Sequence, residues 1–207
     1  MDDSQAYEIL RKLSSPIVAL TCRKGAKMNG MIANSAVRAS IVPGDQRVAL
    51  YVFKRHLTHR ILAETGRFVL HLLSREQWDE IWALGFQSGR DAEKLEGLVH
   101  RESEETGLPI LTRSYAWMEC RVANVMDAGA STFFMGDVVR VDRGTGREVM
   151  DSEFFRENMP EAWRGPYLEN LEAVQAWAAA NEPALDDRPW RVLRERARQA
   201  REARDRG

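Results

Sequence analysis

Cysteine is scarce in this sequence of 207 residues. The two cysteines, Cys22 and Cys120, stand in neither a C-x-x-C nor any other metal-binding spacing. Thiols placed in this way give no support for a zinc or iron–sulfur site. Two cysteines also fall short of the disulfide framework that small secreted domains use. We therefore expect no metal site, and a core that holds together without disulfide or metal cross-links.

Long apolar runs and targeting signals are missing as well. No stretch reaches the ~18 consecutive apolar residues that suggest a transmembrane helix. The first residues, Met1-Asp2-Asp3-Ser4-Gln5, are acidic and polar, whereas a signal peptide begins with a positively charged region. We expect a soluble, cytoplasmic protein that does not bind membranes.

Neither sign of charge is in large excess. Lys and Arg number 30 and Asp and Glu number 31, so the formal net charge is −1. This balance argues against a large nucleic-acid-binding surface, and we expect no nucleic acid partner. The balance is uneven along the chain, because residues 190–207 contain seven arginines against three acidic residues and so carry +4. Acids interleaved with arginines at helical spacing are typical of a solvated helix, the alternatives being a nucleic-acid-binding or acid-binding segment.

Common catalytic and nucleotide-binding motifs are absent too. Gly144-Thr145-Gly146 begins a G-x-G, but Val149 stands where a dinucleotide-binding turn needs its third glycine. The sequence contains no Walker A, H-E-x-x-H or G-x-S-x-G pattern. His56 and His59 form an H-x-x-H without an indicated third ligand, which favours two surface histidines near a helix start. No side chain is therefore predicted to act as a catalytic acid, base or nucleophile.

What the sequence does contain is a strand-rich body followed by a helical end. Hydrophobic residues make up 44% and charged residues 29%, near the averages of globular domains. Short apolar or alternating runs predict strands at residues 17–22, 48–53, 68–73, 117–122 and 132–141. Helical patterns appear at 4–13, 57–64, after the capping box 74–77, at 91–98 and from 151 onward. The expected fold class is mainly β, a barrel or sandwich with helical additions.

Residues 27–40 stand out because packing alone does not explain their composition. Small residues interrupt the apolar pattern, and Gly30, Ala33, Ser35 and Ala36 bring the backbone close to whatever lies above it. Main-chain amides exposed along such a strand are suited to a planar ligand that is rich in hydrogen-bond acceptors. The competing interpretation is an ordinary strand with a β-bulge at Gly30.

An ordered series of short motifs resembles the flavin reductase-like family of FMN-binding split-barrel proteins. The motifs occur in the family's order over about residues 14–142, and the flavin reductase-like domain of high-molecular-weight rubredoxins and diflavin proteins is the most similar variant. They are Asn29 to Ser35, Ser40 to Pro43, Lys54 to His59 with Ile61, Gly66 to Val69, Gly85 to Asp91, Thr106 to Pro109, and Gly129 with Phe134 to Val138.

The resemblance implies a fold, a domain organisation and a cofactor. We expect an FMN-binding split β-barrel over residues 1–142 and a helical C-terminal extension over 143–207 that packs on the barrel or on a partner subunit. The resemblance also implies a homodimer with the flavin near the subunit interface. The expected cofactor is FMN, with FAD as the alternative.

The resemblance also implies which residues hold the flavin. In such proteins, amides matching Ile32 to Ala36 face the ring, the segment matching Lys54 to Thr58 lies near the phosphate, and the loop matching Phe86 to Arg90 borders the ring. The candidate cofactor-binding residues are Asn29, Gly30, Met31, Ile32, Ala33, Asn34, Ser35, Ala36, Ser40, Lys54, Arg55, His56, Leu57, Thr58, Phe86, Ser88 and Arg90. Their cationic and hydroxyl groups suit a phosphate. The hydride chemistry belongs to the cofactor, so no catalytic side chain is predicted beyond the flavin.

The implied function is an NAD(P)H-dependent flavin reductase that passes a hydride to flavin N5 and electrons to a redox-protein or flavin-dependent partner. Family members often carry Gly-x-His-Thr before the last strand, with the histidine near the nicotinamide, and Ser131 stands at that position here. A flavin-bound electron carrier without its own nicotinamide reaction is therefore an alternative. A non-enzymatic barrel that binds another planar ligand, such as haem, is a third. The family's usual Pro-Pro is Pro43-Gly44 in this chain, which we expect to affect only the turn.

Overall fold

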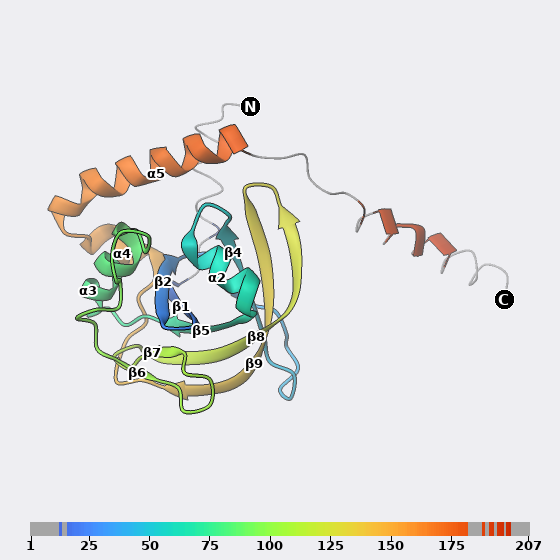
Figure 1. Ribbon diagram of the computed structural model, residues 1–207, viewed down its shortest axis with the longest axis horizontal. Helices are drawn as coiled ribbons and strands as arrows, with labels where there is room; N and C mark the ends of the chain where they lie inside the picture. Colours follow the sequence, from blue (N-terminus) through green and yellow to red (C-terminus); the bar gives the residue numbers. More distant parts are fainter. Residues whose placement is uncertain are drawn as a thin grey trace.

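The computed structural model describes residues 16–181, together with Leu13 and a few positions between 188 and 199. Its largest element is one curled antiparallel sheet of seven strands in the order β2-β1-β5-β8-β9-β4-β3 (Figure 1). These strands are β1 (Val18–Lys24), β2 (Lys27–Ala33), β3 (Val37–Arg38), β4 (Arg47–Phe53), β5 (Arg67–Leu72), β8 (Ala116–Ala128) and β9 (Ser131–Arg143). A separate ribbon pairs β6 (His100–Glu102) with β7 (Pro109–Leu111).

Helical segments pack around the sheet. They are α2 (Leu57–Thr65), α3 (Trp78–Ile81), the π-helix η1 (Trp82–Phe86), α4 (Ser152–Asn158) and α5 (Glu161–Asn181). α2 packs against β1, β2 and β4, whereas η1 packs against β2 and α5. In Figure 1, α5 begins beside α4 and extends along the outside of the molecule. Within the part of the chain that the structure describes, no helix is long and apolar enough to cross a membrane.

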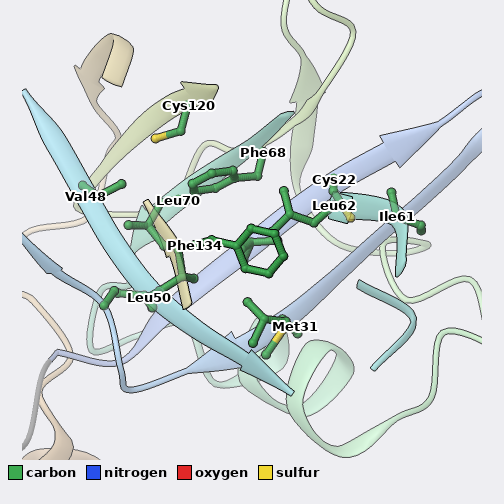
Figure 2. Packing of buried hydrophobic residues seen from close by; sticks show 14 residues of the cluster. Cys22, Met31, Val48, Leu50, Ile61, Leu62, Phe68, Leu70, Cys120 and Phe134 are labelled. Atoms are coloured by element: carbon green, nitrogen blue, oxygen red, sulfur yellow. The ribbon is translucent and has the colours of Figure 1, made fainter. Parts of the chain in front are cut away.

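The inside of the curl is filled by one hydrophobic core. Figure 2 shows Phe68 of β5 and Phe134 of β9 near its centre, with aliphatic side chains from other strands and from α2 around them. Both phenylalanines are at most 2% exposed, and burying a side chain of this size stabilises a fold by about 1.5–3 kcal/mol. Gly136 makes room for Phe68, because a Cβ atom at this position would lie 3.0 Å from the Phe68 Cζ atom.

A second core lies on the other side of β1. Val18 and Leu20 belong to the core inside the curl, while Ala19 packs with residues of α3, η1 and α4. Met150 is fully buried in this second core, accepts a main-chain hydrogen bond from Ile17 at 2.8 Å and donates one to Leu73. The chain after residue 142 thus runs through the folded body before its last helices begin. The domain boundary at residue 142 stays a prediction.

The mainly β fold class with helical additions is confirmed, and the expected strands are present. The strand expected at 117–122 runs on to Ala128, with register shifts at Glu119/Cys120 and Val122/Asn124. Gly66 ends α2 with φ of +64°, a left-handed conformation that glycine adopts readily at the end of a helix.

Two local expectations are wrong. Residues 91–98 form turns rather than a helix, and Gly97 takes φ of +80° there. The β-bulge considered at Gly30 is absent, because β2 pairs with β1 without a break from Lys27 to Ala33. The helix expected at residues 4–13 lies outside the described residues apart from Leu13.

Candidate functional site

Two adjoining cavities lie where β2, η1 and α5 come together. The larger, named the apolar pocket, encloses about 370 Å³ and has walls from β2, β4, η1, α4 and α5. The smaller, named the polar pocket, encloses about 180 Å³ and is lined mainly by residues 55–58 and 84–90. The residues that line both pockets are His56, Gly85, Phe86, Asn170 and Val174. These shared residues make the two cavities parts of one site.

β2 forms a wall of the apolar pocket because it is the last strand at its end of the sheet. One edge of β2 pairs with β1, and no strand of the described chain pairs with the other edge. Main-chain groups along an edge strand lack ladder partners and remain available to a ligand. The residues from Met31 to Ser35 line the pocket at and just beyond the end of this strand. This arrangement offers hydrogen-bonding groups to the rim of a flat ring.

Gly30 allows the π-helix to pack directly against β2. A Cβ atom at Gly30 would lie 2.9 Å from Leu84 Cδ2 and 3.1 Å from the Leu20 carbonyl oxygen. Gly85 meets β2 in a similar way, since its Cβ position would lie 3.2 Å from Ile32 Cγ1. The close approach places Phe86, at the end of η1, where the two pockets join. π-helical turns inside helices occur frequently at functional sites.

The polar pocket is rich in positive charge. Arg55, Arg90 and Lys94 line it, and none of the described residues that line it is acidic. Arg90 donates a hydrogen bond to the Arg55 carbonyl oxygen at 2.8 Å, which fixes the loop after η1 against the turn before α2. Arg55 donates to the Ala173 carbonyl oxygen at 3.1 Å, which ties α5 to the same turn.

Lys94 and Asn29 are buried side chains that face this pocket with unused hydrogen-bonding capacity. Lys94 Nζ donates to the carbonyl oxygens of Gly30 at 2.9 Å and Leu84 at 2.5 Å, so one of its three donors has no partner among the described residues. Burial lowers the pKa of Lys94 to about 8. Asn29 Nδ2 donates to Thr58 Oγ1 at 2.8 Å, while the buried Asn29 Oδ1 has no partner.

The two histidines of the H-x-x-H pair have separate environments. His56 lines both pockets, and burial together with the nearby cations lowers its pKa to about 4, so the ring is neutral at physiological pH. His59 lies 2.8 Å from Thr132 Oγ1 through Nε2, and burial lowers its pKa as well. Among the described residues, no group of three His, Cys, Asp or Glu side chains is arranged to hold a metal ion.

The structure brings most of the candidate cofactor-binding residues to these pockets. The apolar pocket is lined by Met31, Ile32, Ala33, Asn34, Ser35, His56 and Phe86. The polar pocket is lined by Asn29, Arg55, His56, Leu57, Thr58, Phe86, Ser88 and Arg90. Gly30, Ala36, Ser40 and Lys54 line neither pocket. Ala36 belongs to the main core, Ser40 Oγ accepts a hydrogen bond from the Val42 amide, and Lys54 pairs with Asp127. Flavin binding by these residues stays a prediction.

Several other lining residues were not predicted from the sequence. Tyr51 and Phe53 of β4 point outward from the core and line the apolar pocket. Helix α5 contributes Tyr167, Asn170, Leu171 and Val174. In the sequence, Leu171 and Val174 share a helical spacing with Trp177 and Ala178, which indicates that the helix packs against something but not against what. Lys94 carried no signal at all, since a single lysine in a charged stretch is ordinary.

Comparison with known proteins agrees with this architecture. The sequence model of the family described as flavin reductase like domain matches residues 10–161. The high molecular weight rubredoxin of Moorella thermoacetica is 32% identical over 131 residues, which cover 62% of this chain and 56% of that protein. The ferric-chelate reductase (NAD(P)H) of Archaeoglobus fulgidus is 28% identical over 145 residues, which cover 69% of this chain and 84% of the relative.

Solved structures show the same fold. An NADH:FAD oxidoreductase of Streptomyces globisporus has a TM-score of 0.65 and 23% identity, with 72% of this chain and 87% of that one covered. An FMN-binding protein of Thermus thermophilus has a TM-score of 0.58 and 26% identity, and the match covers 64% of this chain and 72% of that one. The matched region contains β2, α2 and η1 and most of the residues that line the two pockets. By its sequence and its fold, the chain belongs to the flavin reductase-like family.

Proposed function

We propose that this protein is an FMN-binding, NAD(P)H-dependent oxidoreductase that reduces its flavin and passes the electrons to a partner. The observation that carries the proposal is the joining of a mostly apolar pocket to a smaller pocket, whose described lining residues include three cations and no acid. A flavin mononucleotide has the same division into a flat ring and a phosphate. Membership of a flavin reductase family agrees with this assignment.

The residues present fit the two ends of such a cofactor. Arg90, Lys94 and Thr58 supply charged and hydroxyl donors for a phosphate. The buried, unpartnered Asn29 Oδ1 takes a hydroxyl donor, which a ribityl chain provides. The edge of β2 supplies main-chain groups for the ring. When bound, the flavin takes up a hydride from NAD(P)H together with one proton, which yields reduced flavin and NAD(P)⁺.

The size of the polar pocket favours FMN over FAD. Its volume of about 180 Å³ suits a phosphate with the end of a ribityl chain, and α5 bounds it through Asn170 and Val174. The hydrogen bond from Arg55 to the Ala173 carbonyl oxygen holds α5 across this end of the site. An adenosine diphosphate group would have to displace that helix.

The names of relatives support a nicotinamide-dependent reaction. An FMN reductase (NADH) of Agrobacterium fabrum is 31% identical over 117 residues. A flavin-bound electron carrier is the second candidate, because Ser131 replaces the histidine that the family resemblance places near the nicotinamide. The match to the rubredoxin of Moorella, of which this chain aligns with 56%, favours the same alternative.

An outward row of apolar side chains supports a homodimer as the functional form. Met126 of β8, Phe133 of β9 and Tyr51 of β4 stand opposite one another on neighbouring strands and so share one face of the sheet. Met126 is 48% exposed and Tyr51 is 43% exposed. Tyr51 also lines the apolar pocket, so this row is continuous with the site. We propose that a second copy of the chain covers the row and that the flavin lies near that interface.

Cofactor identification tests the proposal directly. The purified protein should release FMN, identified by mass, and should bind added FMN with quenching of flavin fluorescence. Anaerobic mixing with NADH or NADPH should then bleach the flavin absorption. A protein that binds neither FMN nor FAD would contradict both flavin functions. A bound flavin that only a reduced redox protein can bleach would select the electron carrier.

A pair of variants tests the location of the phosphate. Arg90→Ala should raise the Kd for FMN by about 10- to 100-fold, since hydrogen bonds to charged groups contribute about 1.5–3 kcal/mol. Lys54→Ala is the matched control, because Lys54 lines neither pocket and pairs with Asp127. A Kd that changes for Lys54→Ala but not for Arg90→Ala would place the phosphate elsewhere.

A further inference from the structure

The apolar pocket has a wall from α4 that the proposed flavin contacts at β2 do not account for. Ser152, Phe155 and Arg156 line this wall, and their spacing of i, i+3 and i+4 puts them on one face of the helix. Ser152 and Phe155 are buried, while Arg156 is half-buried. Asp151 caps the start of α4 by accepting a hydrogen bond from the Phe154 amide at 2.7 Å, which fixes the direction of this face.

Arg156 is the charged group of this pocket. The described residues that line the apolar pocket include no acid, and Arg156 is the only one of them that is cationic at neutral pH. His56 lines the pocket too, but its pKa of about 4 leaves it neutral. Within the described chain, Arg156 makes no ion pair or hydrogen bond. A half-buried arginine without an acidic partner, at the wall of an apolar cavity, is suited to an anion carried by an otherwise apolar ligand.

The anion that Arg156 would bind is distinct from the flavin phosphate. Arg55, Arg90 and Lys94 line only the polar pocket, and Arg156 lines only the apolar pocket. The residues shared by the two pockets lie at their junction and do not include Arg156. One FMN molecule has a single phosphate, so Arg156 is available to a second anionic ligand.

We propose that Arg156 binds the pyrophosphate of a reduced nicotinamide dinucleotide whose dihydropyridine ring enters the apolar pocket beside the α4 wall. This inference rests on the proposed function and names the residue by which the same site recognises its hydride donor. Arginine suits a pyrophosphate because its planar fork of donors pairs with two phosphate oxygens. Phe155 and Tyr167 line the same pocket, and their rings lie 6.0 Å apart, so they supply aromatic surface to a nicotinamide ring.

Equilibrium binding of the oxidised dinucleotide tests this inference without turnover. NAD⁺ and NADP⁺ share the pyrophosphate with the reduced forms and can be titrated calorimetrically into the FMN-loaded full-length protein. Arg156→Ala should weaken the binding of the preferred dinucleotide about tenfold, and Arg156→Lys should lose less, because it keeps the charge. Arg164→Ala is the matched control, since Arg164 lies on α5, pairs with Glu161 and lines neither pocket. Equal affinities in the wild type and Arg156→Ala would overturn the inference.

A donor without phosphates separates recognition of the anion from damage to the pocket. The protein should also be reduced by 1-benzyl-1,4-dihydronicotinamide, which carries the same reacting ring and no charge. Arg156→Ala should raise the KM for NADH or NADPH about tenfold while leaving kcat, and the reduction by the neutral donor, within about twofold of the wild type. Equal losses with both donors would show that the residue only supports the fold and would overturn the inference.

The two proposals fail in different ways. A wild-type protein that binds FMN but neither dinucleotide would overturn the inference about Arg156 and leave FMN binding intact. A wild-type protein that binds no flavin would overturn the proposed function. The same titration of wild type and Arg156→Ala, carried out without flavin, would then still test whether Arg156 binds the dinucleotide.

Discussion

At the scale of single residues, His71 is a buried polar group whose hydrogen-bond partners set its protonation. His71 is fully buried on β5, and its Nδ1 donates to the Ala19 carbonyl oxygen at 3.2 Å. Its Nε2 accepts the Leu111 amide at 3.0 Å, which requires the neutral ring. Burial lowers the pKa of His71 to about 4, so folding excludes the proton that an exposed histidine would take up. Burial lowers the pKa of Lys94 in the same way.

We expect His71 to make the protein sensitive to acid. Above the ordinary histidine pKa of about 6.5 the ring is neutral in both states, so the native hydrogen bonds contribute fully. As the pH falls from about 6.5 to about 4, the unfolded chain binds a proton that the folded chain does not, and stability falls by about 3 kcal/mol. Urea unfolding at several pH values should show a smaller loss in His71→Gln than in the wild type. Parallel curves would contradict the assignment.

Lys94 predicts a pH dependence of flavin binding. The ammonium group favours a bound phosphate, and its pKa of about 8 means that raising the pH from 7 to 9.5 removes the charge. FMN affinity measured by fluorescence quenching should therefore decline above about pH 8, by at most about tenfold per pH unit. Lys94→Met should bind FMN more weakly at pH 7 and lack this decline. Lys27→Met, which removes a lysine that pairs with Glu93 outside both pockets, should behave as the wild type.

At the scale of elements, aromatic packing connects the π-helix to the C-terminal helices. Trp163, at the start of α5, lies 5.0 Å from Trp82, 5.3 Å from Phe86 and 5.9 Å from Trp78, measured between ring centroids. Beyond this cluster α5 has no fully buried residue. Its half-buried residues form one stripe, made up of Tyr167, Leu171, Val174, Trp177 and Ala178. The helix is therefore held mainly at its first turn and by the Arg55 hydrogen bond.

Removing Trp163 should loosen α5 while the sheet stays intact. Trp163→Ala deletes three aromatic contacts, each of which stabilises a pair by about 0.5–1.5 kcal/mol beyond its buried area. Hydrogen exchange followed by mass spectrometry should show faster exchange in residues 161–181, with β1 and β5 unchanged. Leu168→Ala, at a leucine that is 55% exposed on the same helix, should leave the exchange of α5 as in the wild type. Unchanged exchange in Trp163→Ala would show that other contacts hold the helix.

At the scale of the whole molecule, the curl of the sheet encloses one core and leaves an apolar row uncovered. The row of Met126, Phe133 and Tyr51 crosses three neighbouring strands, two of which, β4 and β9, send Leu50 and Phe134 into the interior. Within it, the Tyr51 and Phe133 rings lie 5.0 Å apart. Apolar side chains gathered on a sheet face, next to a pocket, are typical of an interaction surface.

The uncovered row predicts a dimer that a single charge disrupts. Size-exclusion chromatography with light scattering should give the wild type a mass of twice the 23.6 kDa of one chain. Met126→Glu should shift the mass towards a single chain, because two copies would bury unpaired carboxylates against apolar surface. Val99→Glu, at an equally exposed valine outside the row, should remain dimeric. A monomeric wild type would contradict the proposed homodimer.

The sequence predicted much of the fold because strand and helix periodicities are local. The apolar run at residues 17–22 becomes β1, whose alternate side chains enter different cores, so its lack of polar alternation follows from burial on both faces. The flavin-binding motifs predicted β2 and the loops that line the pockets. Lys54 and Ser40 were predicted to bind the cofactor along with these motifs. In the structure Lys54 forms an ion pair with Asp127, and Ser40 Oγ accepts a hydrogen bond from the Val42 amide. A motif spacing locates a segment, but not the direction of each side chain in it.

The sequence by itself determined that this chain is a mainly β protein of near-zero net charge, and its ordered motifs pointed to the family. Only the tertiary structure decided which residues meet around the pockets. Lys94 Nζ contacts the Gly30 carbonyl oxygen across 64 positions, and Arg55 contacts that of Ala173 across 118. Arg156 likewise joins the apolar pocket from a helix that follows the last strand. The spacing of apolar residues along the chain depends on how neighbouring residues face the core, so it can be read from the sequence. A site is formed by segments that are distant in the sequence, and only the folding of the sheet brings them together.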